Sequence, residues 1–219
     1  GADIWTTSVS KNAVATGTQR WLPTINPGRP WVQILASYLS GTPTWTPPAQ
    51  GTARKVRELA GVHSSATAST LTFTLTGEGV PVGHTVILRV CGSYTAGAPT
   101  VTDNAGSGNT WGVDRTAALP ADAGRVAIIS ARVTQALSAG NAVTVTWTGA
   151  VTRKAVLLEQ FSGVMVPTTI NVQDGTTATS GSPSQTLTTT VANTLLVSAL
   201  GVNAGADEDY TSDISWIPS

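Results

Sequence analysis

Residues 99–114 read P-T-V-T-D-N-A-G-S-G-N-T-W-G-V-D and set the pattern for most of the chain. Thr100–Thr102 and Thr110–Val113 are short runs rich in β-branched and aromatic residues. Residues 103–109, between them, are mostly Asp, Asn and Gly, which tolerate left-handed backbone angles and close tight turns. Two β-rich runs joined in this way predict a pair of strands with a glycine-rich connection.

Alternation of apolar side chains with threonine continues this pattern, as in T-L-T-F-T-L-T (residues 70–76) and V-T-V-T-W-T (residues 143–148). A period of two buries one face of a strand and leaves a threonine face to solvent or to a partner. Short strands with no helical period between them predict an all-β fold, an antiparallel β-sandwich of jelly-roll or Ig-like type. We expect strands at residues 70–76, 84–91, 99–102, 110–114, 125–133, 141–148, 153–161, 168–173, 184–190 and 193–201.

The amino-acid composition narrows the classes of partner that the protein could bind. Hydrophobic residues make up 41% of the 219, enough for a substantial core. Only 11% are charged, against about 25% in typical soluble domains, so the polar surface must come from Thr, Ser, Asn, Gln and Gly. Such a surface suits a protein that packs against many copies or partners, and it equally suits an extracellular β-protein. The 12 basic and 12 acidic residues cancel, which argues against nucleic acid or an anionic membrane as the main partner.

The first 50 residues differ from the rest, because they hold four of the seven tryptophans and half of the twelve prolines. Proline at this density predicts a mostly irregular N-terminal arm, except for residues 31–39, which fit one strand or a short helix. The tryptophans either cap the open end of the following domain or dock on another subunit, since Trp is enriched at interface hot spots. The candidate partner-binding residues are Trp5, Trp21, Trp31 and Trp45.

The arm is expected to end in a linker, giving a boundary between residues 1–60 and a sandwich domain over residues 61–219. Gln50–Gly61 carries the main charge cluster and predicts one or two helical turns, a solvated linker rather than a phosphate site. Trp216, near the C-terminus, indicates either a strand added late or a sequence that stops short of the natural C-terminus. With no apolar run of membrane-spanning length and no signal-peptide pattern, we expect no membrane anchor.

The side chains that could carry catalysis do not form a catalytic set in sequence. Cys91 is the only cysteine and lies in an apolar run, which predicts a buried, inert thiol. His63 and His84 lack the spaced ligands of a metal site. Glu78 and Glu159 could serve a glycosidase only if they faced each other across a cleft. No G-x-S-x-G motif occurs either, so we expect no enzyme, no catalytic residue and no cofactor.

Two binding possibilities remain open in the loops. Asp103, Asn104 and Asn109 with Asp114, and residues 207–209, offer oxygen ligands to calcium, but Asp and Asn in tight turns usually bond the backbone, so no metal is predicted. Aromatic rings near loops can stack on sugars, although buried aromatics are commoner. The candidate glycan-facing residues are Tyr94 and Trp111, with Tyr210 a further ring near a loop.

Three motifs resemble a known module: T-V-T-D-N-A-G-S-G-N-T-W, A-L-S-A-G-N-A-V-T-V-T-W-T-G-A-V and A-V-L-L-E-Q-F-S-G-V. They are similar to a β-sandwich module of actinobacteriophage virion proteins of the minor tail or capsid decoration type, which also occurs in bacterial surface proteins. The resemblance covers residues 65–216 and brings no catalytic motif. It implies a non-enzymatic virion protein, a homo-oligomer contacting other virion proteins. The alternative is a carbohydrate-binding or adhesin-type module that recognises a host surface glycan.

Overall fold

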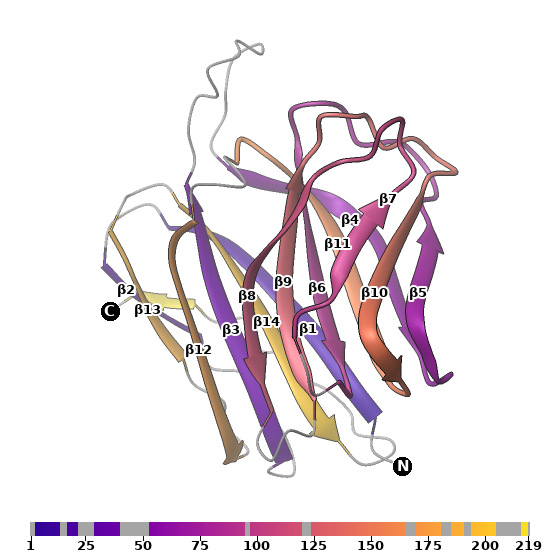
Figure 1. Ribbon diagram of the computed structural model, residues 1–219. Coiled ribbons are helices and arrows are strands. Elements are labelled where there is room, and N and C mark those ends of the chain that lie inside the picture. The colour runs from indigo at the N-terminus through magenta and orange to yellow at the C-terminus, as the bar shows by residue number, and fades with distance from the viewer. Residues whose placement is uncertain are drawn as a thin grey trace.

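The computed structural model describes residues 3–13, 17–21, 29–39, 53–94, 97–119, 124–164, 170–180, 185–190, 194–204 and 216–218. Throughout these ranges the chain forms strands and loops, arranged as antiparallel sheets that stack on one another (Figure 1). The expected all-β, antiparallel β-sandwich is therefore confirmed. Among the described residues there is no helix with the length and apolar character needed to cross a membrane.

The strands between residue 54 and residue 162 build the two sheets of a sandwich. A five-stranded sheet of order β4-β11-β6-β9-β8 faces a three-stranded sheet of order β5-β10-β7. These strands are β4 Arg54–Ser64, β5 Ala68–Thr74, β6 Thr85–Gly92, β7 Thr100–Asp103, β8 Trp111–Ala118, β9 Arg125–Arg132, β10 Ala142–Val151 and β11 Lys154–Ser162.

The pairing of these strands follows most of the jelly-roll scheme. The first strand pairs with the last (β4 with β11), the second with the seventh (β5 with β10), and the third with the sixth (β6 with β9). The fourth and fifth strands depart from this scheme, because β8 pairs with β9 instead of β7. The β5-β10-β7 sheet is consequently one strand short.

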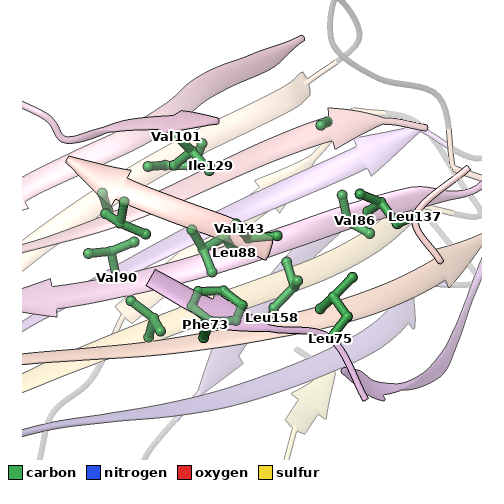
Figure 2. Packing of buried hydrophobic residues seen from close by; sticks show 14 of the residues in the cluster. Phe73, Leu75, Val86, Leu88, Val90, Val101, Ile129, Leu137, Val143 and Leu158 are labelled. Carbon is green, nitrogen blue, oxygen red and sulfur yellow. The ribbon is translucent and has the colours of Figure 1, made fainter. Parts of the chain in front are cut away.

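The core of the sandwich lies between its two sheets (Figure 2). Phe73 and Leu75 from the β5 side meet Leu88 of β6, Val143 of β10 and Leu158 of β11, all with 6% exposure or less. Burying side chains of this size contributes about 1.5–3 kcal/mol each. Alternation on β5 and β10 thus places their apolar face inward, as the sequence predicts.

A third sheet covers the outer face of the five-stranded sheet, and we call it the terminal sheet (Figure 1). Its strands are β1 Asp3–Ala13, β3 Arg29–Leu39, β12 Ile170–Ser180 and β14 Thr194–Ala204, in the order β1-β14-β3-β12. Because β6 and β9 are covered on both faces, all of β6 and the centre of β9 are buried. Their sequences are accordingly continuous apolar runs rather than alternating ones.

A fourth, small sheet of order β13-β2-β15 lies beyond the terminal sheet. It contains β2 Gly17–Trp21, β13 Gln185–Thr189 and β15 Trp216–Pro218. Leu187 of β13 packs with Leu35 and Leu196, which project from the terminal sheet on the side away from the sandwich.

The structure corrects the expectation of a mostly irregular arm. Residues 3–13, 17–21 and 29–39 are strands, and the choice left open for residues 31–39 resolves as β3. Proline density is misleading here because five of the six prolines lie outside these strands and Pro30 is the second residue of β3. The strands expected at 168–173, 184–190 and 193–201 exist, but they build the terminal and small sheets instead of the sandwich.

The helical turns expected within Gln50–Gly61 are wrong, because β4 spans residues 54–64 and pairs with β11. Two register shifts in that pairing break the period of two, so the strand pattern is hidden in the sequence. The boundary expected after residue 60 falls inside β4, and whether residues 1–60 form a separate unit remains a prediction.

Candidate functional site

The outward face of the β5-β10-β7 sheet is built almost entirely from threonine, and we call it the threonine face. Register places Thr72, Thr144 and Thr102 in one row across the three strands. Thr70, Thr146 and Thr100 form the next row. With Thr74 and Thr148 at the ends of the strands, most of these side chains are exposed.

No ionisable side chain lies at the outward positions of β5, β7 or β10. Some hydroxyls pair within the face, since the Thr72 and Thr144 oxygens lie 2.9 Å apart and the Thr100 hydroxyl donates to the Thr146 carbonyl at 3.5 Å. The surface therefore presents methyl groups and hydroxyls without charge. A partner can cover such a surface without desolvating an ion, which is the costly step in burying polar surface.

The glycine-rich loop at residues 103–109 is closed by its own side chains. The Asp103 carboxylate accepts bonds from the Ala105 and Asn109 amides, each at 3.1 Å, and from the indole Nε1 of Trp111 at 2.8 Å. Gly108, with φ of 80°, has the left-handed conformation that the turn requires. The Asp103 carboxylate thus bonds the loop itself, and the Asn109 side-chain amide also joins the loop to the backbone of residues 134 and 135. The described part of the chain contains no group of three or more His, Cys, Asp or Glu side chains that could hold a metal.

Neither described glycan candidate presents a free ring. Tyr94 is only 6% exposed and packs against Trp147 with ring centroids 6.2 Å apart, so its face is unavailable for stacking on a sugar. Trp111 is half-buried against the sandwich core and is held by Asp103. Tyr210 lies outside the described residues, as do residues 207–209.

The terminal sheet meets the five-stranded sheet across a buried surface, which we call the docking interface. Its apolar part is a cluster in which Val32 and Ile34 of β3 and Val197 of β14 pack with Ile128 of β9 and Phe161 of β11. These side chains are all fully buried. The outer face of the five-stranded sheet is therefore a second hydrophobic surface, and strands from both ends of the chain cover it.

A polar contact lies within this interface. The Tyr38 hydroxyl of β3 donates to the Asp114 carboxylate of β8, and the Ser130 hydroxyl of β9 donates to the same carboxylate at 3.0 Å. Burial raises the pKa of Asp114 to about 6, although both hydrogen bonds act to lower it. Burial, reinforced by the Asp114 charge, raises the pKa of Tyr38 well above its ordinary value. The contact fixes the position of β3 on the sandwich.

A buried ion pair lies on the same side of the five-stranded sheet. The Glu159 carboxylate of β11 binds the fully buried guanidinium of Arg89 on β6 and the ammonium of Lys55 on β4. Burial alone would raise the pKa of Glu159, but the two cations outweigh it and hold that pKa below its usual range. Glu159 thus links three neighbouring strands, β4, β11 and β6.

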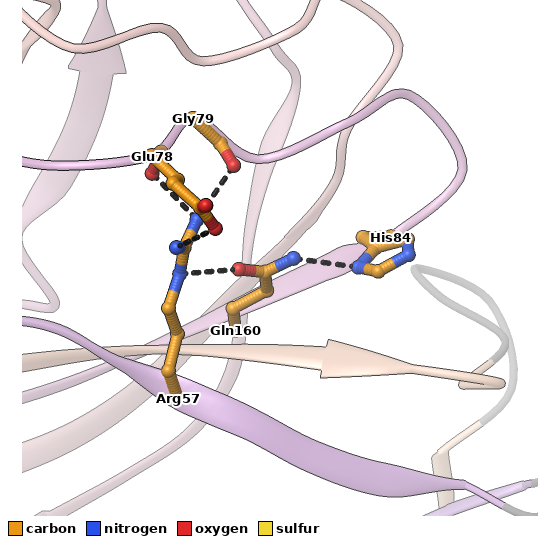
Figure 3. A network of polar contacts seen from close by, with 5 residues as sticks. All are labelled: Arg57, Glu78, Gly79, His84 and Gln160. Atoms are coloured by element: carbon orange, nitrogen blue, oxygen red, sulfur yellow. Dashed lines mark hydrogen bonds and ion pairs between the residues drawn. The ribbon is translucent and has the colours of Figure 1, made fainter.

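Glu78 does not face Glu159, because it lies on an exposed loop and binds Arg57 at 3.1 Å (Figure 3). Arg57 also donates through Nη2 to the Gly79 carbonyl at 2.6 Å and through Nε to Gln160 at 2.9 Å. Gln160 Nε2 lies 2.7 Å from His84 Nδ1. Partial burial, with nearby cations, lowers the pKa of His84. This network ties the loop before β6 to β4 and β11, which is a structural task.

The remaining candidate residues are Cys91 and the four tryptophans of the first 50 residues. Cys91 is buried as expected, and burial raises the pKa of its thiol far above its ordinary value. Register places Trp5 of β1 and Trp31 of β3 on either side of Val202, and Trp21 of β2 opposite Gln185 and Trp216. Trp45 lies outside the described residues.

Sequence reasoning missed three polar side chains of the docking interface, Tyr38, Arg89 and Ser130. It grouped Asp114 with the 103–109 loop as a possible calcium ligand, whereas the structure places that carboxylate with Tyr38 and Ser130. One signal was present, because Arg89 interrupts the apolar run V-I-L-R-V-C. An arginine within such a run indicates a buried pair on a second covered face. Compared with family models, with curated proteins and with solved structures, the chain matches none of them.

Proposed function

We propose that this chain is a non-enzymatic structural protein of a bacteriophage virion, with its sandwich displayed on the tail or the capsid. The three motifs that resemble virion modules all lie in the sandwich. The loop motif forms the β7–β8 turn, the second motif forms β10, and the third forms β11. The residues that carry the resemblance therefore lie in strands and a turn of the sandwich, and they include no catalytic motif.

The threonine face carries the proposal. It is exposed, uncharged and regular in register, which suits repeated contacts with neighbouring virion proteins. The side chains that could have supported catalysis instead hold strands together: Glu159 with Arg89, Glu78 with Arg57, and His84 with Gln160. We infer that the chain forms a homo-oligomer, because virion positions come in symmetric sets.

A host-glycan role has less support. Tyr94 is buried and Trp111 is half-buried against the sandwich core, so neither offers a fully exposed ring to a sugar. The threonine face offers hydroxyls to a glycan but no aromatic platform. We therefore assign this face to protein contacts.

Incorporation of a charged variant into virions tests this proposal. Thr70→Lys with Thr102→Lys places two cations on opposite edges of the threonine face, at exposed positions outside the sandwich core. Ala136→Lys with Ala139→Lys adds the same charge to the exposed loop before β10 and serves as the control. Mass spectrometry of virions from the encoding phage measures the copy number of each variant.

We expect the wild-type chain in virions, the loop variant at the same copy number, and the face variant reduced about tenfold, the effect of roughly 1.4 kcal/mol of lost contact energy. Equal thermal unfolding of the two variants shows that the loss is one of contact rather than of folding. Absence of the wild-type chain from virions refutes the virion role. Normal incorporation of the face variant refutes the assignment of the threonine face.

A further inference from the structure

The terminal sheet alternates strands from the two ends of the chain. In the order β1-β14-β3-β12, β1 and β3 come from residues 3–39, and β14 and β12 come from residues 170–204. Among the described strands, β1 pairs with β14, and β3 lies between β14 and β12. The N-terminal strands therefore do not pair with each other, and residues 3–39 cannot form this sheet without the C-terminal strands.

The paired strands lie far apart in sequence and are therefore synthesised at different times. Asp3 pairs with Ala204, and Leu39 pairs with Thr194. The N-terminal strands are made first, but their partners are made after the whole sandwich. Contacts this distant in sequence form late, and strands left unpaired meanwhile are available to other chains.

The connection between β3 and β4 is long enough in sequence to bridge two copies of the chain. It runs from residue 40 to residue 53, fourteen residues, and extended chain of that length reaches about 48 Å. β3 ends and β4 begins at the same end of the molecule (Figure 1). The chain also enters and leaves the sandwich at the docking interface, since Arg54 pairs with Ser162 and both Ala53 and Val164 belong to its apolar cluster.

We propose that residues 3–39 exchange between two copies of this chain, so that β1 and β3 of each copy complete the terminal sheet of the other. Every contact of the docking interface is kept in the exchanged dimer. Tyr38 of one copy then donates to Asp114 of the second copy, and Val32 and Ile34 pack on that copy's Ile128. Such exchange needs no new surface and closes with twofold symmetry. It deepens the proposed assembly role, on which it rests, by naming the surface through which copies join.

Disulfide trapping distinguishes exchange from a closed monomer. Ala36 of β3 and Val197 of β14 are direct partners in register and fully buried. Partners across an antiparallel pair lie within the range that a disulfide spans. Ala36→Cys with Val197→Cys, in a Cys91→Ala background, joins the two strands on oxidation with glutathione. The linkage lies within one chain in a monomer and between chains after exchange.

The control is Thr72→Cys with Thr144→Cys in the same background. These residues are also direct partners, on β5 and β10, but both lie within the sandwich. We expect the control to oxidise to a monomer. The variant that joins β3 to β14 should run at twice the monomer mass on a non-reducing gel and return to monomer mass on reduction.

A disulfide-linked monomer in the β3–β14 variant refutes exchange, while the virion role is still decided by the incorporation experiment. Two free thiols in that variant, with an oxidised control, show that β3 does not lie beside β14 and likewise refute the proposal. An exchanged dimer that is absent from virions would retain the exchange and refute the virion role.

Discussion

Replacing Tyr38 by Phe should destabilise the protein in a pH-dependent way. The substitution removes one hydroxyl and keeps the ring that fills the docking interface. Asp114 then keeps the bond from the Ser130 hydroxyl at 3.0 Å. A hydrogen bond to a charged group contributes about 1.5–3 kcal/mol, and a bond between neutral groups about 0.5–1.5 kcal/mol.

The protonation state of Asp114 decides which of these values applies. Its pKa is raised to about 6, above the value of roughly 3.9 in an unfolded chain, so the folded state favours the protonated carboxyl. At pH 8 the carboxylate is ionised, and losing the Tyr38 bond should cost about 2 kcal/mol. At pH 5 the carboxyl is mostly protonated, and the cost should fall to about 1 kcal/mol. The substitution also raises the pKa of Asp114 further, because the Tyr38 bond lowers it.

Urea unfolding of the wild type and the variant at pH 8 and pH 5 measures this difference. With an m value of about 3 kcal/mol per molar, the midpoint should fall by about 0.7 M at pH 8 and by about half of that at pH 5. Tyr94→Phe is the matched control, because Tyr94 is also buried but its hydroxyl bonds no carboxylate. Its effect should be the same at both pH values. An equal shift for Tyr38→Phe at the two pH values would refute the contact between β3 and β8.

Two further substitutions test the packing of the layers and the closure of the loop. Gly201→Ala should destabilise the protein by about 1–3 kcal/mol, because an added Cβ would lie 2.3 Å from Val126 Cγ2 and 2.7 Å from Cys91 Sγ. Adding Val126→Ala should recover part of that loss in a thermal melt, and strict additivity would contradict the packing. Asp103→Ala should cost about 2–3 kcal/mol, since the loop amides and the Trp111 indole lose their acceptor. It should also alter Trp111 fluorescence; an unchanged emission spectrum would argue against that bond.

The sandwich strands could be predicted because their local signals agree with the fold. In β5 and β10 the alternation of threonine with apolar residues marks one buried face, and the residues of the 103–109 loop specify the turn after β7. The role of Asp103 follows from local spacing, since its carboxylate bonds residues within its own loop. These features depend on neighbours in sequence, which is why they can be predicted without a structure.

The terminal sheet could not be predicted in the same way, because its pairs join residues at opposite ends of the chain. Nothing near Tyr38 or Asp114 in sequence indicates that they meet, 76 residues apart. β4 was hidden because its register with β11 shifts twice. Tyr94 was misjudged for a related reason, since a ring next to a loop is buried here by Trp147 of a distant strand.

Oxidation of a single introduced cysteine tests most directly whether the terminal sheet lies on the sandwich. The native Cys91 Sγ lies 2.7 Å from the Cβ position of residue 201. This is close to the distance between the Cβ atom of one cysteine and the Sγ atom of the other in a disulfide. Gly201→Cys, combined with Val126→Ala to remove the crowding methyl groups, should form a disulfide with Cys91 and leave no thiol reactive after unfolding. Gly149→Cys, in open space, should leave two thiols. Two free thiols in the Gly201→Cys variant would contradict the docking of β14 on β6.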